Sequence, residues 1–119
     1  MHVLDSSALI DVLRLNERGK RVIAKLGPMK AVTTVFSVHE LLLFQPFIEP
    51  LFESIDVLDF DKAAAKESAA LQKMLEKKGT RLQAIDNFIA SICISHDATL
   101  VTTDGDFLRV PGLKMLHIK

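Results

Sequence analysis

Short apolar runs alternate along the chain with longer stretches of helical periodicity. Runs rich in apolar and β-branched residues predict strands at His2–Leu4, Ala31–Phe36, Ile55–Phe60, Thr99–Thr102 and Leu113–Ile118. Helical patterns lie between them, through Ala8–Leu13, from Ser37 to Phe44, from Lys62 to about Lys78 and from about Gln83 to His96. Strands that alternate with helices predict an α/β fold, with a central, mostly parallel sheet covered by helices on both faces.

Glycines and hydroxyl residues predict where these elements begin and end. Ser6 and Ser7 are expected to cap the first helix, and Ser37 with Glu40 fits the capping box S-x-x-E. Gly19 is expected to interrupt the chain after that first helix, ahead of a basic stretch.

Composition limits the class of protein. A chain of 119 residues with 49% hydrophobic and 25% charged residues predicts one folded domain over residues 1–119. Its formal net charge of +0 means that any affinity for nucleic acid must come from a local patch. The single cysteine, Cys93, indicates a reducing compartment, so we expect a cytoplasmic protein without an export signal. No apolar stretch approaches the roughly 20 residues of a membrane span.

Acidic residues stand where the predicted strands end. Asp5 follows the first strand, and Asp104 and Asp106 follow the strand at Thr99–Thr102. Ligands of open parallel sheets bind outside the carboxyl ends of the strands, so these side chains are expected to face one crevice.

Two further acids lie near predicted helix starts. Glu40 and Asp86 are expected at the same edge of the sheet, because helices that cover a parallel sheet run antiparallel to its strands. Five converging carboxylates could not all stay ionised without a compensating charge. A divalent cation with all-oxygen ligands supplies that charge, and Mg²⁺ or Mn²⁺ fits this ligand set.

Each acid also has a structural interpretation. Glu40 could close the capping box, Asp86 could interact with its helix dipole, and Asp104 and Asp106 could belong to an ordinary turn. The ordered set, rather than any single acid, favours a metal site.

Four ordered motifs resemble the PIN-domain ribonucleases, and in particular the VapC-type toxins of VapBC toxin–antitoxin modules. The motifs are LDSSALI from Leu4, VHEL from Val38, DNFIA from Asp86 and LVTTDGDF from Leu100. The resemblance implies a three-layer α/β/α PIN-like fold. It also implies an Mg²⁺- or Mn²⁺-dependent endoribonuclease that uses metal-activated water and leaves 5′-phosphate and 3′-hydroxyl ends.

The same resemblance implies roles for individual residues. Asp5, Glu40, Asp86 and Asp104 would be catalytic metal ligands, with Asp106 as an auxiliary acid. Thr102 and Ser6 would support the ligands by hydrogen bonds; Ser6 stands where related chains often carry Thr. The implied partners are an RNA substrate and an antitoxin protein.

Two surface features concern these partners. Arg14, Arg18, Lys20 and Arg21 are the best candidates for phosphate contacts, although a solvated helix face would have the same composition. The apolar run from Leu41 to Phe52 predicts a homodimer contact or an antitoxin groove, unless the core absorbs it.

Two other classes of function stay open at this point. A PIN-like module could bind RNA or a protein without cleaving it. A receiver-type phospho-acceptor domain has a similar length and an acidic pocket, but it would need adjacent acids near the first strand.

Overall fold

The computed structural model describes residues 1–119, and its centre is one sheet of five strands. The strands are β1 (His2–Leu4), β2 (Ala31–Thr34), β3 (Asp56–Leu58), β4 (Thr99–Thr102) and β5 (Lys114–His117). They lie in the order β3-β2-β1-β4-β5, and all neighbouring pairs are parallel. The prediction of a mostly parallel sheet is confirmed.

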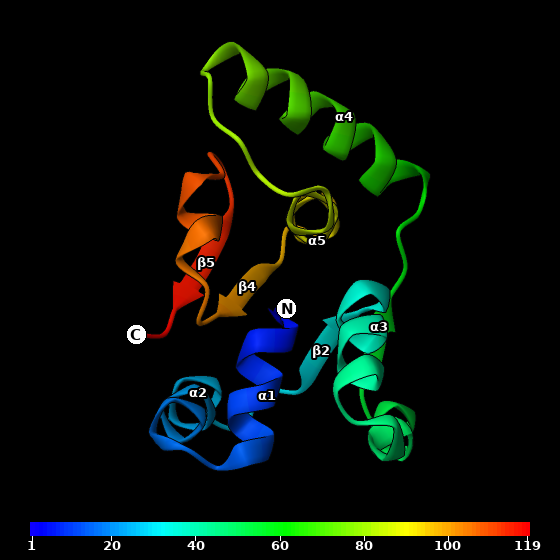
Figure 1. Ribbon diagram of the computed structural model, residues 1–119, viewed down its shortest axis with the longest axis vertical. Coiled ribbons are helices and arrows are strands. Elements are labelled where there is room, and N and C mark those ends of the chain that lie inside the picture. The colour runs from blue at the N-terminus through cyan, green and yellow to red at the C-terminus, as the bar shows by residue number, and fades with distance from the viewer.

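Helices cover both faces of this sheet and complete a three-layer α/β/α fold (Figure 1). They are α1 (Ser6–Arg14), α2 (Glu17–Leu26), α3 (Val35–Phe44), α4 (Lys62–Lys77) and α5 (Ala84–Ser95), with the 3₁₀ segments η1 (Pro46–Glu53) and η2 (Gly105–Arg109). No helix combines the length and the hydropathy that a bilayer span requires.

Side chains of the central strands point alternately into two separate hydrophobic cores. Val3 of β1 and Leu100 of β4 join the core formed with α4, α5 and η2. The next residues, Leu4 and Val101, join the core formed with α1, α2 and α3. This alternation is the period of a strand with both faces buried, and it explains why these strands are apolar throughout.

The strand order places a crevice between β1 and β4. From β1 the chain adds β2 and β3 on one side, and it then crosses to add β4 and β5 on the other side. The carboxyl ends of β1 and β4 therefore flank the switch point where a doubly wound sheet binds ligands. Receiver domains have the order 2-1-3-4-5 instead. The topology therefore excludes the receiver alternative.

Strand-end residues, not the serines, begin the first and third helices. Asp5 caps α1 by accepting the backbone N–H of Ala8, and Thr34 caps α3 by accepting that of Ser37. The expected caps at Ser6, Ser7 and Ser37 are therefore wrong. The second strand ends at Thr34 because the chain turns there directly into α3.

Gly19 does not interrupt the chain; it lies buried inside α2. A Cβ at this position would stand 2.0 Å from the carbonyl oxygen of Asp11 in α1. The glycine is present because α1 and α2 approach each other at backbone distance, a tertiary reason that outweighs its poor helix propensity.

Candidate metal centre

Three carboxylates meet at the carboxyl edge of the sheet. One oxygen each of Asp86, Asp104 and Asp106 lies within 4.8 Å of the others. Asp86 comes from the first turn of α5, whereas the other two stand at the start of η2, just past β4. The Oδ1 atom of Asp104 accepts the backbone N–H of Asp106 at 2.9 Å, which fixes the turn that carries both.

Asp5 lies at the end of the neighbouring strand and is 3% exposed. Leu4 pairs with Val101 in the sheet, so the following residues, Asp5 and Thr102, are adjacent. The Oδ1 atom of Asp5 accepts hydrogen bonds from the N–H of Ala8 at 3.0 Å and the hydroxyl of Ser7 at 2.7 Å, and Oδ2 accepts one from the Thr102 hydroxyl. Three donors thus fix the orientation of this buried carboxyl group.

Thr102 and Ser7 connect Asp5 to the acidic turn. The Thr102 hydroxyl accepts the backbone N–H of Asp104 at 3.0 Å, and the Ser7 hydroxyl accepts that of Thr103 at 3.1 Å. The predicted role of Thr102 therefore has a geometric basis. Sequence reasoning named Ser6 for the companion role, but the hydroxyl on Asp5 belongs to Ser7; a role for Ser6 stays a prediction.

Glu40 reaches the same edge from the second turn of α3. Phe36, one turn earlier, packs against Phe60 and Phe88 with ring centroids 5.6 and 5.3 Å away, and Phe60 and Phe88 are 4.8 Å apart. These three rings join α3 to α5, the helix that carries Asp86. The sequence pattern does not reveal this cluster, because its three members lie in segments that are far apart along the chain.

The electrostatics show that the five acids act on one another. The pKa of Asp86 is raised to about 6, first by burial and then by the charges of Asp104, Asp106, Glu40 and Asp5. Burial also raises the pKa of Asp5, against the opposing effect of its three hydrogen bonds. All the other acids predicted from the sequence therefore contribute to the electrostatic potential at Asp86.

This donor set fits a hard divalent cation. The groups are all carboxylate oxygens, and their negative charges repel one another. Burial and the neighbouring charges raise the pKa of Asp86 and of Asp5 above the ordinary value. Mg²⁺ and Mn²⁺ take such oxygen ligands and neutralise such a cluster. Cys93 offers no soft ligand or nucleophile, since it is buried in the core and its pKa is raised to about 12.

The four predicted RNA-binding cations lie on α1 and α2 and have partners within the chain. Arg18 pairs at 3.1 Å with Asp11, a buried carboxylate that would be costly without it. Lys20 pairs with Glu17 at 3.5 Å, Arg14 stands over the ring of Phe44, and Arg21 donates to the carbonyl of Lys119. Their role in RNA binding stays a prediction.

The apolar run from Leu41 to Phe52 divides between the core and the surface. Leu41 is buried, and Ile48 and Phe52 pack against the α1–α2–α3 core. Leu43 and Phe47, in contrast, are 74% and 77% exposed. The alternative in which the core absorbs the whole run is therefore wrong.

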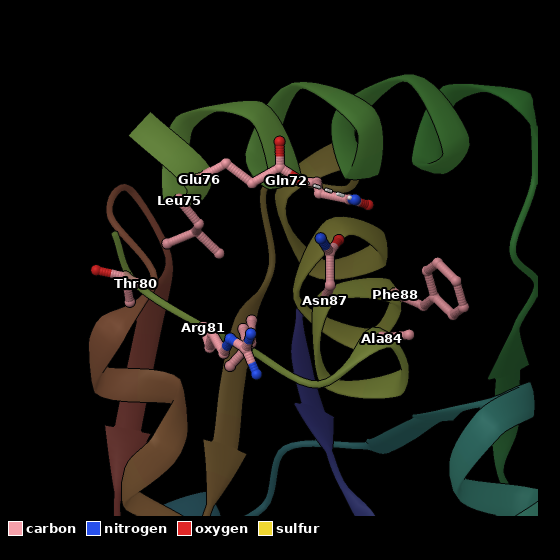
Figure 2. Close-up of a pocket in the computed structure, with 9 residues that line it drawn as sticks. Gln72, Leu75, Glu76, Thr80, Arg81, Ala84, Asn87 and Phe88 are labelled. Atoms are coloured by element: carbon pink, nitrogen blue, oxygen red, sulfur yellow. Dashed lines mark hydrogen bonds between the residues drawn. The ribbon is translucent and has the colours of Figure 1, made fainter. Parts of the chain in front are cut away.

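A polar network and a hollow lie between α4 and α5. Asn87, in the turn of α5 that carries Asp86, accepts hydrogen bonds from the hydroxyls of Ser68 at 2.8 Å and Ser91 at 3.0 Å. This network ties α5 to α4 and so fixes the helix start that presents Asp86. The hollow has a volume of about 380 Å³. Figure 2 shows Asn87 among the side chains that line it, with Arg81 on the loop leading to α5.

Comparisons with known proteins agree with this arrangement. The model of the PIN domain matches residues 2–113. Over 69 residues, 57% of this chain, the sequence is 30% identical to the tRNA(fMet)-specific endonuclease VapC of Salmonella typhimurium, and the chain spans about half of that relative's length, 52%.

Solved structures of low sequence identity share the fold. A chain of VapBC2 from Rickettsia felis superposes with a TM-score of 0.84 at 20% identity, over 99% of this chain and 98% of that one. A chain of VapBC-5 from Mycobacterium tuberculosis, a member of the VapBC family of toxin–antitoxin systems, gives 0.79 at 23% identity over 98% of each chain.

Proposed function

The chain belongs to the PIN-domain family, and from this membership and its acidic edge we propose that it is an Mg²⁺- or Mn²⁺-dependent endoribonuclease. One observation carries the proposal. Carboxylates of Asp86 and of the Asp104–Asp106 turn, from elements far apart in sequence, lie within 4.8 Å of one another at the edge where such sheets bind ligands.

The positions of the acids indicate which of them would bind the ion. Asp86, Asp104 and Asp106 are the closest group and would hold the ion, with Asp5 and Glu40 adding negative charge beside it. A bound Mg²⁺ or Mn²⁺ polarises a phosphodiester and lowers the pKa of a coordinated water. Thr102 and Ser7 keep Asp5 in place, so that this carboxylate needs no rearrangement when substrate binds.

The first prediction tests the proposed nuclease directly. In MgCl₂ or MnCl₂ the chain should cleave single-stranded RNA internally, and EDTA should stop the reaction. Asp86→Asn should lower the cleavage rate by about 100-fold or more, since changes that only touch a ligand's supports already cost 10–100-fold. Product ends are read by labelling: 5′-phosphate and 3′-hydroxyl ends are expected.

Asp97→Asn is the matched control, because Asp97 follows the opposite end of α5 and pairs with Lys114 on the surface. It should cleave like the wild type. A folded wild type that binds RNA but cleaves none in either metal would contradict the proposal and favour a PIN-like binding module.

We propose further that the nuclease is the toxin of a type II toxin–antitoxin pair. The Salmonella relative is a VapC endonuclease, and the structures from Rickettsia felis and Mycobacterium tuberculosis are of VapBC pairs. Expression alone should arrest growth, and co-expression of a small neighbouring reading frame should relieve the arrest. Growth unaffected by the active wild-type chain would contradict the toxin assignment.

Exposed apolar side chains support a homodimer. Leu43 and Phe47 stand on the surface of the α3–η1 segment, and water-exposed groups of this size favour association. Light scattering after size exclusion should show a dimer at micromolar concentration, and Leu43→Glu should shift it toward the monomer. A wild type that is strictly monomeric at that concentration would exclude this contact.

A further inference from the structure

Two arginines outside the basic stretch are linked to each other at the acidic edge, where Arg109 also contacts a carboxylate. The Nη2 atom of Arg109 lies 3.3 Å from Oδ1 of Asp106, and its Nη1 donates to the carbonyl of Arg81 at 3.1 Å. One guanidinium thus joins η2, which carries Asp106, to the loop that leads into α5, which carries Asp86.

These arginines line a hollow that opens at the acidic site. Its volume is about 560 Å³, and its walls are Arg81, Leu82, Gln83, Asp106 and Arg109. Asp106 belongs both to this wall and to the group of three carboxylates. The hollow therefore adjoins the group of three carboxylates through Asp106. Arg81 also lines the hollow between α4 and α5, so it borders both depressions. Figure 2 shows it on the loop that leads to α5.

The charge balance explains what the hollow could bind. A polyanion that approaches the five acids meets repulsion, and cations beside them are needed to attract its backbone. The four cations on α1 and α2 do not line the hollow beside Asp106. Among the groups around the acids, Arg81 and Arg109 are the guanidinium groups that line the same depression.

Arg109 can exchange its partner at little cost. In its pair with Asp106 the two side chains are 52% and 49% exposed, and ion pairs this accessible to water contribute little to stability. Guanidinium groups bind phosphate oxygens in a bidentate fashion, which gives them a geometric preference for a phosphodiester.

We propose that Arg81 and Arg109 form a phosphate-binding subsite, which holds the RNA backbone phosphate next to the one that is cleaved at the carboxylates. The inference rests on the proposed nuclease function. Arg109 has a second part as a positioning residue, because its Nη1 contact with the carbonyl of Arg81 ties η2 to the loop before α5.

RNA binding in EDTA tests the subsite without hydrolysis. Fluorescence anisotropy with a labelled single-stranded RNA should show that Arg81→Gln and Arg109→Gln each raise Kd by about tenfold. Each should also reduce the slope of log affinity against log salt by about 0.7, the value for one phosphate contact on a single strand. Lys73→Gln, an exposed cation on α4, is the control and should change neither quantity.

Cleavage kinetics separate binding from positioning. Arg81→Gln should raise KM with little change in kcat, whereas Arg109→Gln should raise KM and also lower kcat. Arg109→Lys should recover part of the affinity through its charge, but not kcat, since one ammonium group cannot replace both N–H contacts of the guanidinium.

The outcomes distinguish this inference from the nuclease proposal. A wild type that never cleaves RNA overturns the function on which the subsite rests. A wild type that cleaves, together with Arg81→Gln and Arg109→Gln proteins that fold and keep the wild-type Kd and salt slope, overturns the subsite alone. Arg81 is exposed, so its variant is expected to fold and keeps the test decisive.

Discussion

The carboxyl group of Asp5 is buried and accepts hydrogen bonds from three donors. The hydroxyls of Ser7 and Thr102 point their protons at Asp5 and accept backbone N–H groups of residues 103 and 104 in return. Both hydroxyls are thereby satisfied in both directions, which fixes Asp5 relative to the acidic turn. Such buried networks have large effects when one member is removed.

Thr102→Val removes one of these hydroxyls without changing the shape of the side chain. Asp5 loses a donor and the N–H of Asp104 loses its acceptor, so the free energy of unfolding should fall by about 1–3 kcal/mol. Metal affinity should fall by about 10–100-fold because the carboxylates lose their support. Urea unfolding and Mn²⁺ titration measure the two effects. Thr99→Val, at the other end of β4, is the control; equal metal affinity in wild type and Thr102→Val would contradict the assigned role.

At this scale the sequence indicated which acids converge, but not which hydroxyl donates to Asp5. Ser6 and Ser7 are chemically identical and adjacent, and only the direction of α1 relative to β4 decides that Ser7 faces Asp5. Asp5 also caps α1 through its Oδ1 atom, a use that the pattern of residues does not reveal.

Two of the acids lie near the starts of helices, and this could be predicted. Because α3 and α5 begin at the carboxyl edge of the sheet, Glu40 and Asp86 were expected there. The prediction that Gly19 would interrupt the helical structure was wrong, because it rested on the poor helix propensity of glycine alone. Contact between two helices decides the conformation of this residue.

Gly19→Ala tests that contact. Alanine favours a helix over glycine by about 0.8–1.0 kcal/mol, but its Cβ would stand 2.0 Å from the carbonyl oxygen of Asp11. Forcing α1 and α2 apart costs about 1–3 kcal/mol, so urea unfolding should show a net loss of stability. Lys20→Ala, the next residue and an exposed one, should be neutral or slightly stabilising. A Gly19→Ala protein more stable than the wild type would mean that the helices are not in backbone contact.

At the scale of the whole molecule, the parallel sheet gathers residues that are distant in sequence. The strand order puts β1 beside β4, so Asp5 and the Asp104–Asp106 turn become neighbours. The alternation of strands and helices predicts a shared carboxyl edge for these acids, but not this strand order. The subsite of Arg81 and Arg109 did not follow, because neither arginine belongs to a motif or a charged run. Their proximity depends on the path of η2 and of the loop before α5, which periodicity does not specify.

The gathered acids make stability depend on pH in a direction that is opposite to the usual one for carboxylates. The pKa of Asp86 is about 6 in the folded protein and near the ordinary 3.8 when unfolded, and the pKa of Asp5 is raised as well. Between pH 6 and 4 the folded state therefore binds more protons than the unfolded state. Its free energy of unfolding must then fall as pH rises through this window.

The metal-free protein should accordingly become more stable when the buffer is acidified from pH 7 to pH 5. Asp86→Asn should reduce this gain and should be more stable than the wild type at pH 7 in EDTA, because it removes one repelling charge. Asp97→Asn should keep the wild-type profile, since the pKa of Asp97 is lowered by Lys114, away from the acids. Comparing the variants cancels every pH-dependent contribution that the three proteins have in common.

Divalent metal should reverse the trend, because it binds the deprotonated carboxylates. At 100 times its dissociation constant, Mn²⁺ should add about 2.7 kcal/mol to the free energy of unfolding at pH 7. That increment should shrink as pH falls below 6 and protons compete for Asp86. Thermal unfolding across pH 5–7.5, in EDTA and in MnCl₂, measures both trends. A Mn²⁺ increment that is the same at pH 5 and pH 7 would show that the ion does not bind at these acids.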